Sequence, residues 1–183
     1  MKIAIAGMLG AGKSTVAKEL AKKLNYQHFS SGDFMRQLAK ERGITLDETS
    51  KIAERDKSID EEIDKRQVKF GKEKDNFVID GRLSWHFIPD SIKIYLDVSE
   101  EEAANRIWGD KQENRKNEGF KTKEELIKKI KERKASESKR YLSYYGIDHH
   151  NKKNYDFIID TNNKPISKVI SEILSKIDKK KSL

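Results

Sequence analysis

The chain has 183 residues and no cysteine, which excludes disulfides and thiolate chemistry and favours a reducing, cytoplasmic setting. Its 39 Lys and Arg exceed its 31 Asp and Glu, giving a formal net charge of +8, yet acids and bases alternate along most of the sequence. No apolar run approaches the length that spans a bilayer, so we expect no membrane partner and, without an arginine-rich cluster, no nucleic acid.

The amino terminus is predicted to be a strand, a phosphate-binding loop and a helix. Residues 2–6 form a short apolar run typical of a strand buried on both faces. Over residues 13–24, apolar residues recur every four positions, as on the inward face of a helix. Between them, Gly7–Ser14 matches the pattern G-x-x-x-x-G-K-[ST] at every fixed position.

Each part of this loop has a chemical task. Its glycines allow backbone conformations that a Cβ bars, so that N–H groups can converge on a phosphate. Lys13 can reach the β and γ oxygens, and the Ser14 hydroxyl can hold Mg²⁺. A turn that only joins strand to helix is the alternative, which the strand–loop–helix context disfavours. We therefore expect nucleoside triphosphate binding by Gly7, Met8, Leu9, Gly10, Ala11, Gly12, Lys13, Ser14 and Thr15.

The strand and helix predicted after the phosphate-binding loop carry a candidate anion-binding residue. Residues 27–30 are predicted to be a strand and residues 31–42 a helix that Gly43 ends. Arg36 lies one turn into this helix, where the dipole already favours anions. A surface arginine on an ordinary helix is the alternative interpretation.

The pattern Thr45–Glu48 predicts a capping box that starts another helix. In the following helix, expected over 59–72, Arg66 falls on the apolar face, where it needs a partner, an anionic ligand or a route to solvent. Asp64 and Gln67 form part of the adjacent stripe. They could hydrogen-bond a base or sugar, or they could simply be solvated.

Residues 76–80 are an apolar strand that ends in Asp80. The carboxyl ends of parallel strands face the ligand crevice, so Asp80 is expected to bind Mg²⁺ or its waters, although a turn aspartate is the alternative. Gly81 and Arg82 follow, and a small residue beside a fixed cation suits a second phosphate. Arg36 and Arg82 are therefore predicted to clamp the phosphate of an acceptor.

The second half continues the alternation of strands and helices. In the long helix, Arg133 and Arg140 share a face, and the preceding loop adds Arg115 and Lys116. Cations on a mobile flap suit phosphoryl transfer, whereas a charged exposed helix is the alternative. The elements expected are a strand at 91–97, a helix at 99–108, an exposed loop at 109–122, a helix at 123–145, a strand at 155–160 and a helix at 165–177.

Five apolar strands separated by helices predict an α/β fold of three layers, with a five-stranded parallel sheet and helices on both faces. We expect one domain over 1–183, with an acceptor-binding region at about 31–72 and a lid at about 109–135. The four histidines have no Cys or acidic partner at metal-ligand spacing in the sequence and are interpreted as structural or surface residues.

With these motifs in view, the chain resembles nucleoside monophosphate kinases, most closely the archaeal type of cytidylate kinase. The likeness spans nearly the whole chain. It is carried by residues 7–15, Ser30–Asp33 with Arg36, 41–46, 63–67, 80–83, 135–141, 145–148 and 155–161.

The resemblance implies a monomeric P-loop kinase that transfers the γ-phosphoryl group of ATP to CMP or dCMP with Mg²⁺. It implies catalytic roles for Lys13, Arg133 and Arg140, and metal binding by Ser14 and Asp80. One departure is that residues 108–120 supply a single arginine, Arg115, where the family's lid has more. The acceptor residues that it implies are Ser31, Gly32, Asp33, Arg36, Asp64, Arg66, Gln67, Gly81 and Arg82.

Two alternatives stay open at this point. A kinase of the same fold could use another acceptor, such as AMP or UMP, because discrimination rests on hydrogen bonds from a few side chains. A protein of a different class, which uses ATP as a switch in RNA binding or ribosome assembly, would suit the net charge and the basic tail Lys179–Lys181.

Overall fold

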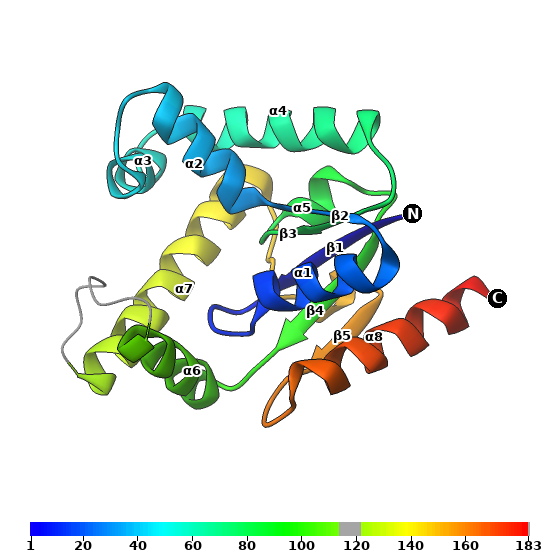
Figure 1. Cartoon of the computed structure of the whole chain (residues 1–183). Helices are drawn as coiled ribbons and strands as arrows, with labels where there is room; N and C mark the ends of the chain where they lie inside the picture. The colour runs from blue at the N-terminus through cyan, green and yellow to red at the C-terminus, as the bar shows by residue number, and fades with distance from the viewer. Residues whose placement is uncertain (114–121, 183) are drawn as a thin grey trace. The chain divides into compact units, whose positions relative to one another are not determined.

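The computed structural model describes residues 1–113 and 122–182 (Figure 1). Its residues group into two compact units, one comprising Met1–Ala6 and Ser14–Ile94, the other Gly7–Lys13 and Tyr95–Leu183. The strands are β1 (Lys2–Gly7), β2 (Gln27–Ser30), β3 (Phe77–Asp80), β4 (Ile92–Asp97) and β5 (Phe157–Asp160). The helices are α1 (Lys13–Leu24), α2 (Ser31–Glu41), α3 (Leu46–Ala53), α4 (Ser58–Glu73), α5 (Ser84–Phe87), α6 (Glu100–Glu113), α7 (Lys123–Tyr145), the 3₁₀ turn η1 (Lys152–Asn154) and α8 (Ile166–Lys181).

The strands form one five-stranded sheet in the order β2-β3-β1-β4-β5. Strand β3 pairs in parallel with both β1 and β2, in a register that sets Asp80 opposite Ile5 and Ser30. The predicted α/β fold with a five-stranded parallel sheet is therefore confirmed.

Apolar side chains from β1, β3 and α4 build the core of the first unit. Ile5, Phe77 and Ile79 are fully buried. The Phe70 ring of α4 lies 4.7 Å from Phe77 and 4.2 Å from Phe29 of β2, measured between centroids. These aromatic contacts seat α4 against the strands and so fix the position of the helices that pack on it.

Helices α2, α3 and α4 lie side by side in the first unit (Figure 1) and share a small apolar cluster. The cluster comprises Leu38, Ala53, Ile59 and Ile63. The predicted capping box starts α3, because the Thr45 hydroxyl accepts from the Glu48 N–H at 3.2 Å and the Glu48 carboxylate accepts from the Thr45 N–H at 2.7 Å. Each partner satisfies a donor that the helix end would otherwise leave unpaired.

An ion-pair network on the outside of these helices holds Arg66. Its guanidinium donates to Glu41 of α2 at 3.2 Å and to Glu62 of α4 at 2.7 Å, and Arg42 also reaches Glu62 at 2.8 Å. Hydrogen bonds from Arg66 lower the pKa of Glu41, and hydrogen bonds from Arg42 and then Arg66 lower the pKa of Glu62. Arg66, which the sequence pattern placed on the apolar face of α4, is thus partly exposed and has acidic partners within the fold.

In the second unit, α6 and α7 pack on each other through Ala104, Ile107, Leu126 and Ile130. This packing carries α6 to Glu113, so residues 109–113 are helical where a loop was predicted from their polarity. The tertiary contact overrides the weak helix propensity of Gly109. Residues 114–121 of the predicted loop, with Arg115 and Lys116, lie outside the described residues.

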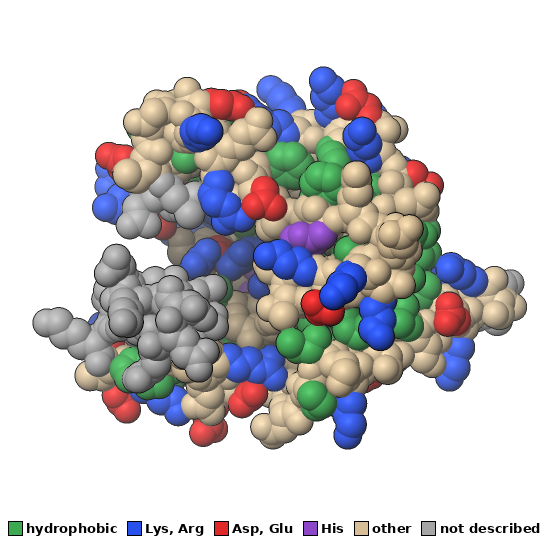
Figure 2. Space-filling model, viewed as in Figure 1, with side chains coloured by type: hydrophobic (Ala, Val, Ile, Leu, Met, Phe, Trp, Pro, Cys, Tyr) green, Lys and Arg blue, Asp and Glu red, His purple; other side chains and the backbone are tan. Residues whose placement is uncertain are grey.

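The termini of several helices also differ from the predictions. Helix α8 continues to Lys181, because its lysines suit the negative end of the helix dipole. Helix α5 and the turn η1 are too short to leave a periodic pattern and were not predicted. Among the described helices, none has a stretch both long and apolar enough to cross a membrane. Figure 2 shows Lys and Arg side chains beside Asp and Glu over the visible face, as the alternating charges of the sequence suggested.

Gly7 should not tolerate a side chain. Its φ is +147°, and an added Cβ would lie 2.4 Å from the carbonyl oxygen of Leu96. Gly7→Ala is expected to lower the free energy of unfolding by about 2–3 kcal/mol, through backbone strain and the clash with a neighbouring strand. Gly109→Ala is the control, since nothing lies within 4 Å of its Cβ position in α6. The free energy of unfolding of that variant should rise by about 0.5–1 kcal/mol. Equal stabilities in urea denaturation would contradict this account of Gly7.

The Arg66 network predicts a stability that depends on pH. A carboxylate whose pKa is lowered on folding stabilises the fold above its ordinary pKa, and this contribution disappears as pH falls through the lowered value. Arg66→Met should therefore reduce the melting temperature by a few degrees at pH 7, with a difference that shrinks as pH falls below 4.5, the ordinary pKa of glutamate. Lys69→Met is the control, because Lys69 pairs with Glu73 on the same helix at 3.9 Å while both side chains are exposed. A loss that persists unchanged at pH 3 would instead indicate lost packing.

Candidate functional site

The predicted phosphate loop is well formed within the second unit. Gly7, Gly10 and Gly12 have φ values of +147°, +78° and +80°, which favour glycine. The Lys13 ammonium donates to the Met8 carbonyl oxygen at 2.8 Å, across the loop. The backbone thus curves around the lysine in the way that brings N–H groups together on an anion.

The outer side of this loop packs on α6 and α7. A Cβ at Gly10 would lie 2.8 Å from the backbone of Ala103, so this loop residue is pressed against α6. The Leu9 side chain contacts the α6–α7 cluster that includes Ile107 and Ile130. Leu9 therefore anchors the loop by burying apolar surface, a role separate from phosphate binding.

The carboxylate of Asp80 is the centre of a hydrogen-bond network in the first unit. Its side chain is only 5% exposed. Ser14 Oγ donates to Asp80 Oδ2 at 2.8 Å and Ser30 Oγ lies 3.3 Å from the same oxygen, while His28 Nε2 lies 2.6 Å from Oδ1. Residues from α1 and β2 thus surround the carboxylate that ends β3.

His28 was not predicted to belong to this network, because in the sequence it has no acidic partner nearby. The register explains the contact. His28 pairs with Val78, Ser30 pairs with Asp80, and side chains two residues apart on a strand point to the same face. Strand alternation combined with the parallel alignment could therefore have found it.

The oxygen atoms beside the carboxyl end of β3 are suitable ligands for a magnesium ion. Ser14 Oγ and Asp80 Oδ2 are hard donors within 2.8 Å of each other. In the part of the chain that the structure describes, no group of three or more His, Cys, Asp or Glu side chains is arranged to hold a metal. Mg²⁺ needs no such cage, because it keeps several waters and takes one or two protein ligands together with substrate phosphates.

The start of α2 and the turn after β3 carry most of the predicted acceptor residues. Ser30 caps α2 by accepting from the Gly32 N–H at 3.2 Å, and Asp33 forms an ion pair with Arg36. Gly81 donates its N–H to the Ile5 carbonyl oxygen at 3.1 Å. The first two contacts are local to α2, and the third joins the turn after β3 to β1. Because Ser30 is aligned with Asp80, this turn lies level with the first residue of α2.

Gly81 is packed tightly from two sides. A Cβ there would lie 2.6 Å from Ser31 Oγ and 2.2 Å from Ser84 Oγ. Just after it, the Arg82 carbonyl oxygen accepts from Trp85 Nε1 at 3.0 Å. The turn that presents Arg82 is thus held by α2 on one side and α5 on the other.

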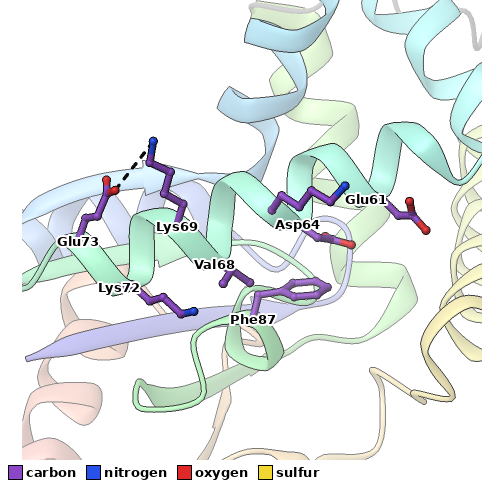
Figure 3. A pocket seen from close by; sticks show the side chains of 8 residues that line it. Glu61, Asp64, Val68, Lys69, Lys72, Glu73 and Phe87 are labelled. Atoms are coloured by element: carbon purple, nitrogen blue, oxygen red, sulfur yellow. Dashed lines mark ion pairs between the residues drawn. The ribbon is translucent and has the colours of Figure 1, made fainter.

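The three predicted acceptor residues of α4 lie in different surroundings. Arg66 is in the ion-pair network with Glu41 and Glu62. Gln67 is 3% exposed and bonded to Ser84. Asp64 borders a groove of about 550 Å³ along α4, with Val68 and Phe87 as its apolar part (Figure 3). Gln67 Nε2 also lies 3.4 Å from Asp64 Oδ1, so the structure brings these two side chains together, while Arg66 pairs with Glu41 and Glu62.

Two arginines of α7 remain as candidates for the transferred phosphate. Arg133 Nε donates to Glu137 at 2.9 Å, and the Arg133 side chain is 57% exposed. Arg140 lies with its guanidinium carbon 5.2 Å from the centroid of the Tyr141 ring. Arg115, predicted to add a lid cation, is outside the described residues.

Comparison with known proteins identifies the family of the chain. The model of the cytidylate kinase-like family matches residues 2–163. The cytidylate kinase of Methanocaldococcus jannaschii is 41% identical over 97% of this chain and 98% of its own, and that of Methanosphaera stadtmanae is 36% identical over 99% and 100%.

Comparison with solved structures identifies the fold. The shikimate kinase of Bacteroides thetaiotaomicron superposes with a TM-score of 0.67 over 97% of this chain and 98% of its own, at 17% identity. At that identity, the likeness shows a common P-loop kinase fold. The family match over residues 2–163, which takes in the phosphate loop, Asp80 and Arg82, shows that the chain belongs to the cytidylate kinase-like family.

Proposed function

We propose that this chain is a cytidylate kinase that transfers the γ-phosphoryl group of ATP to CMP and dCMP. The observation that carries the proposal is its relation to archaeal cytidylate kinases over almost the full length of both chains. The absence of cysteine supports a reducing compartment, the cytoplasm. We further propose that the monomer acts as one kinase domain, with an acceptor region at about 31–72 and a lid at about 109–135.

In the proposed reaction, an oxygen of the acceptor's phosphate forms a bond to the γ-phosphorus while the bond from that phosphorus to ADP breaks. The products are ADP and CDP, and no covalent enzyme intermediate is needed. The protein's contribution is to position both nucleotides and to neutralise charge. The phosphate loop and Lys13 hold ATP, and Arg133 and Arg140 balance the charge on the transferred group.

The acceptor's phosphate is assigned to the cations that follow β2 and β3. Arg36 of α2 and Arg82 after β3 supply planar guanidinium groups that match phosphate oxygens. Ser31, Gly32, Asp33 and Gly81 border the same segments. We assign the nucleoside to the side of Asp64, Arg66 and Gln67, as the family resemblance implies.

Ser14 and Asp80 would hold Mg²⁺. Held there, the ion would supply positive charge that offsets the negative charge of the ATP phosphates. His28 and Ser30 would orient the Asp80 carboxylate, because each lies within hydrogen-bond distance of it. Such outer partners typically matter almost as much as the ligand itself.

Release of ADP with a panel of acceptors tests the proposal. CMP and dCMP should support turnover well above UMP, AMP, GMP and shikimate. Turnover with AMP alone would assign the same fold to another acceptor. ATP hydrolysis that needs no acceptor, together with salt-sensitive RNA binding, would favour the switch protein instead.

Two substitutions separate the donor and acceptor roles. Lys13→Ala should abolish measurable transfer with every acceptor, because the loop loses its charge on the β and γ phosphates. Arg82→Ala should raise the KM for CMP by roughly 10- to 100-fold, as expected for a lost hydrogen bond between charged groups, and leave the KM for ATP unchanged. An Arg82→Ala enzyme with an unaltered KM for CMP would remove Arg82 from the acceptor site.

The dependence on Mg²⁺ tests Asp80 and His28 together. Asp80→Asn keeps the shape but loses the charge, and the Mg²⁺ concentration for half-maximal rate should rise by at least about tenfold. His28→Leu should shift it in the same direction by a smaller factor. His28→Gln keeps an N–H donor and should restore most of the loss. If Asp80→Asn has the wild-type requirement for Mg²⁺, the metal binds elsewhere.

A further inference from the structure

A buried chain of polar side chains links α4 to the turn that carries Gly81 and Arg82. Gln67 is 3% exposed and Ser84 is fully buried. Ser84 Oγ donates to Gln67 Oε1 at 2.7 Å, and Gln67 Nε2 makes a longer contact of 3.4 Å with Asp64 Oδ1. Because a buried amide is costly unless it is hydrogen-bonded, these contacts fix the orientation of the Gln67 side chain.

The same Ser84 hydroxyl lies against the turn. It occupies the space beside Gly81, where a Cβ would come within 2.2 Å of Ser84 Oγ. Ser84 is also the first residue of α5, directly after Gly81–Leu83. One hydroxyl group therefore both borders the turn and ties it to α4 through Gln67.

Helix α4 also packs on the helix that carries the other candidate cation, Arg36. Helix α2, which carries Arg36, packs on α4 through Leu38, Ile59 and Ile63. Arg82 is connected to α4 through Ser84 and Gln67. The relative placement of the two cations thus depends on a single helix, and Gln67 is its polar link to the Arg82 turn.

We infer that Ser84 and Gln67 are positioning residues for the acceptor's phosphate. They hold the turn that carries Arg82 in place and do not contact the nucleotide. The inference rests on the proposed function and changes one part of it. Gln67 then serves phosphate binding by holding the turn, and hydrogen bonding to the nucleoside is not its task.

A double-mutant cycle in the full chain tests the inference. Ser84→Ala and Gln67→Met should each weaken CMP binding, measured by calorimetry without ATP, by about tenfold. The double variant should be no weaker than either single variant, because both remove the same link. In steady-state assays, the KM for CMP should rise by a similar factor, while the KM for ATP and kcat at saturating CMP stay near wild type.

Ser91→Ala is a matched control. Ser91 is also a buried serine of the first unit, 6% exposed, and its hydroxyl donates to the Ile88 carbonyl oxygen at 2.6 Å. It has no contact with Gln67 among the hydrogen bonds of the described residues. The Ser91→Ala variant should bind CMP with the affinity of the wild type. Should Ser84→Ala fail to fold, Ser84→Cys takes its place in the cycle, because its slightly larger thiol is only a weak donor.

Three results would overturn the inference. Additive losses would mean that Gln67 contacts the nucleotide itself. Equal losses in Ser84→Ala and Ser91→Ala would indicate general destabilisation, and wild-type affinity in Ser84→Ala would deny it a role. A wild-type chain that binds neither CMP nor dCMP is a separate outcome, which defeats the proposed function and this role with it.

Discussion

The parallel register of β1, β2 and β3 is the constraint on which the candidate site depends. Asp80 lies opposite both Ile5 and Ser30, so β2 and β3 end at one level of the sheet, while β1 continues two residues further to Gly7. The segments that follow them carry most of the candidate residues. A shift of one residue in β3 would turn the Asp80 side chain to the other face and separate it from Ser14, Ser30 and His28.

The cost of burying the Asp80 carboxylate is offset by partners of several kinds. A charge taken out of water is destabilising unless donors surround it, and here the donors are two hydroxyl groups and one imidazole. They come from β2 and from the first turn of α1. The network therefore stabilises the unit and orients the carboxylate before any ligand arrives, which lowers the reorganisation that binding requires.

Sequence alone predicted the features that depend on local patterns. The bounds of α1, β2 and α7 agree with the structure, and the capping box at Thr45 forms as expected. Contacts between distant segments were harder to predict. The Arg66–Glu41 pair, the tie from Ser84 to Gln67 and the approach of His28 to Asp80 each join residues on different elements, and no pattern within one element alone predicts them. The extension of α6 to Glu113 likewise follows from packing on α7.

Within the second unit, the packing of Leu9 and Gly10 against neighbouring helices couples the phosphate loop to the stability of α6 and α7. The loop shares an apolar cluster with these helices, so a local unfolding that separates α6 from α7 also releases one wall of the loop. A ligand that binds only the intact loop must then suppress that opening by mass action. Amide hydrogens along α6 and α7 consequently report on nucleotide occupancy through their exchange with solvent, although the coupling runs through hydrocarbon contacts and involves no charge.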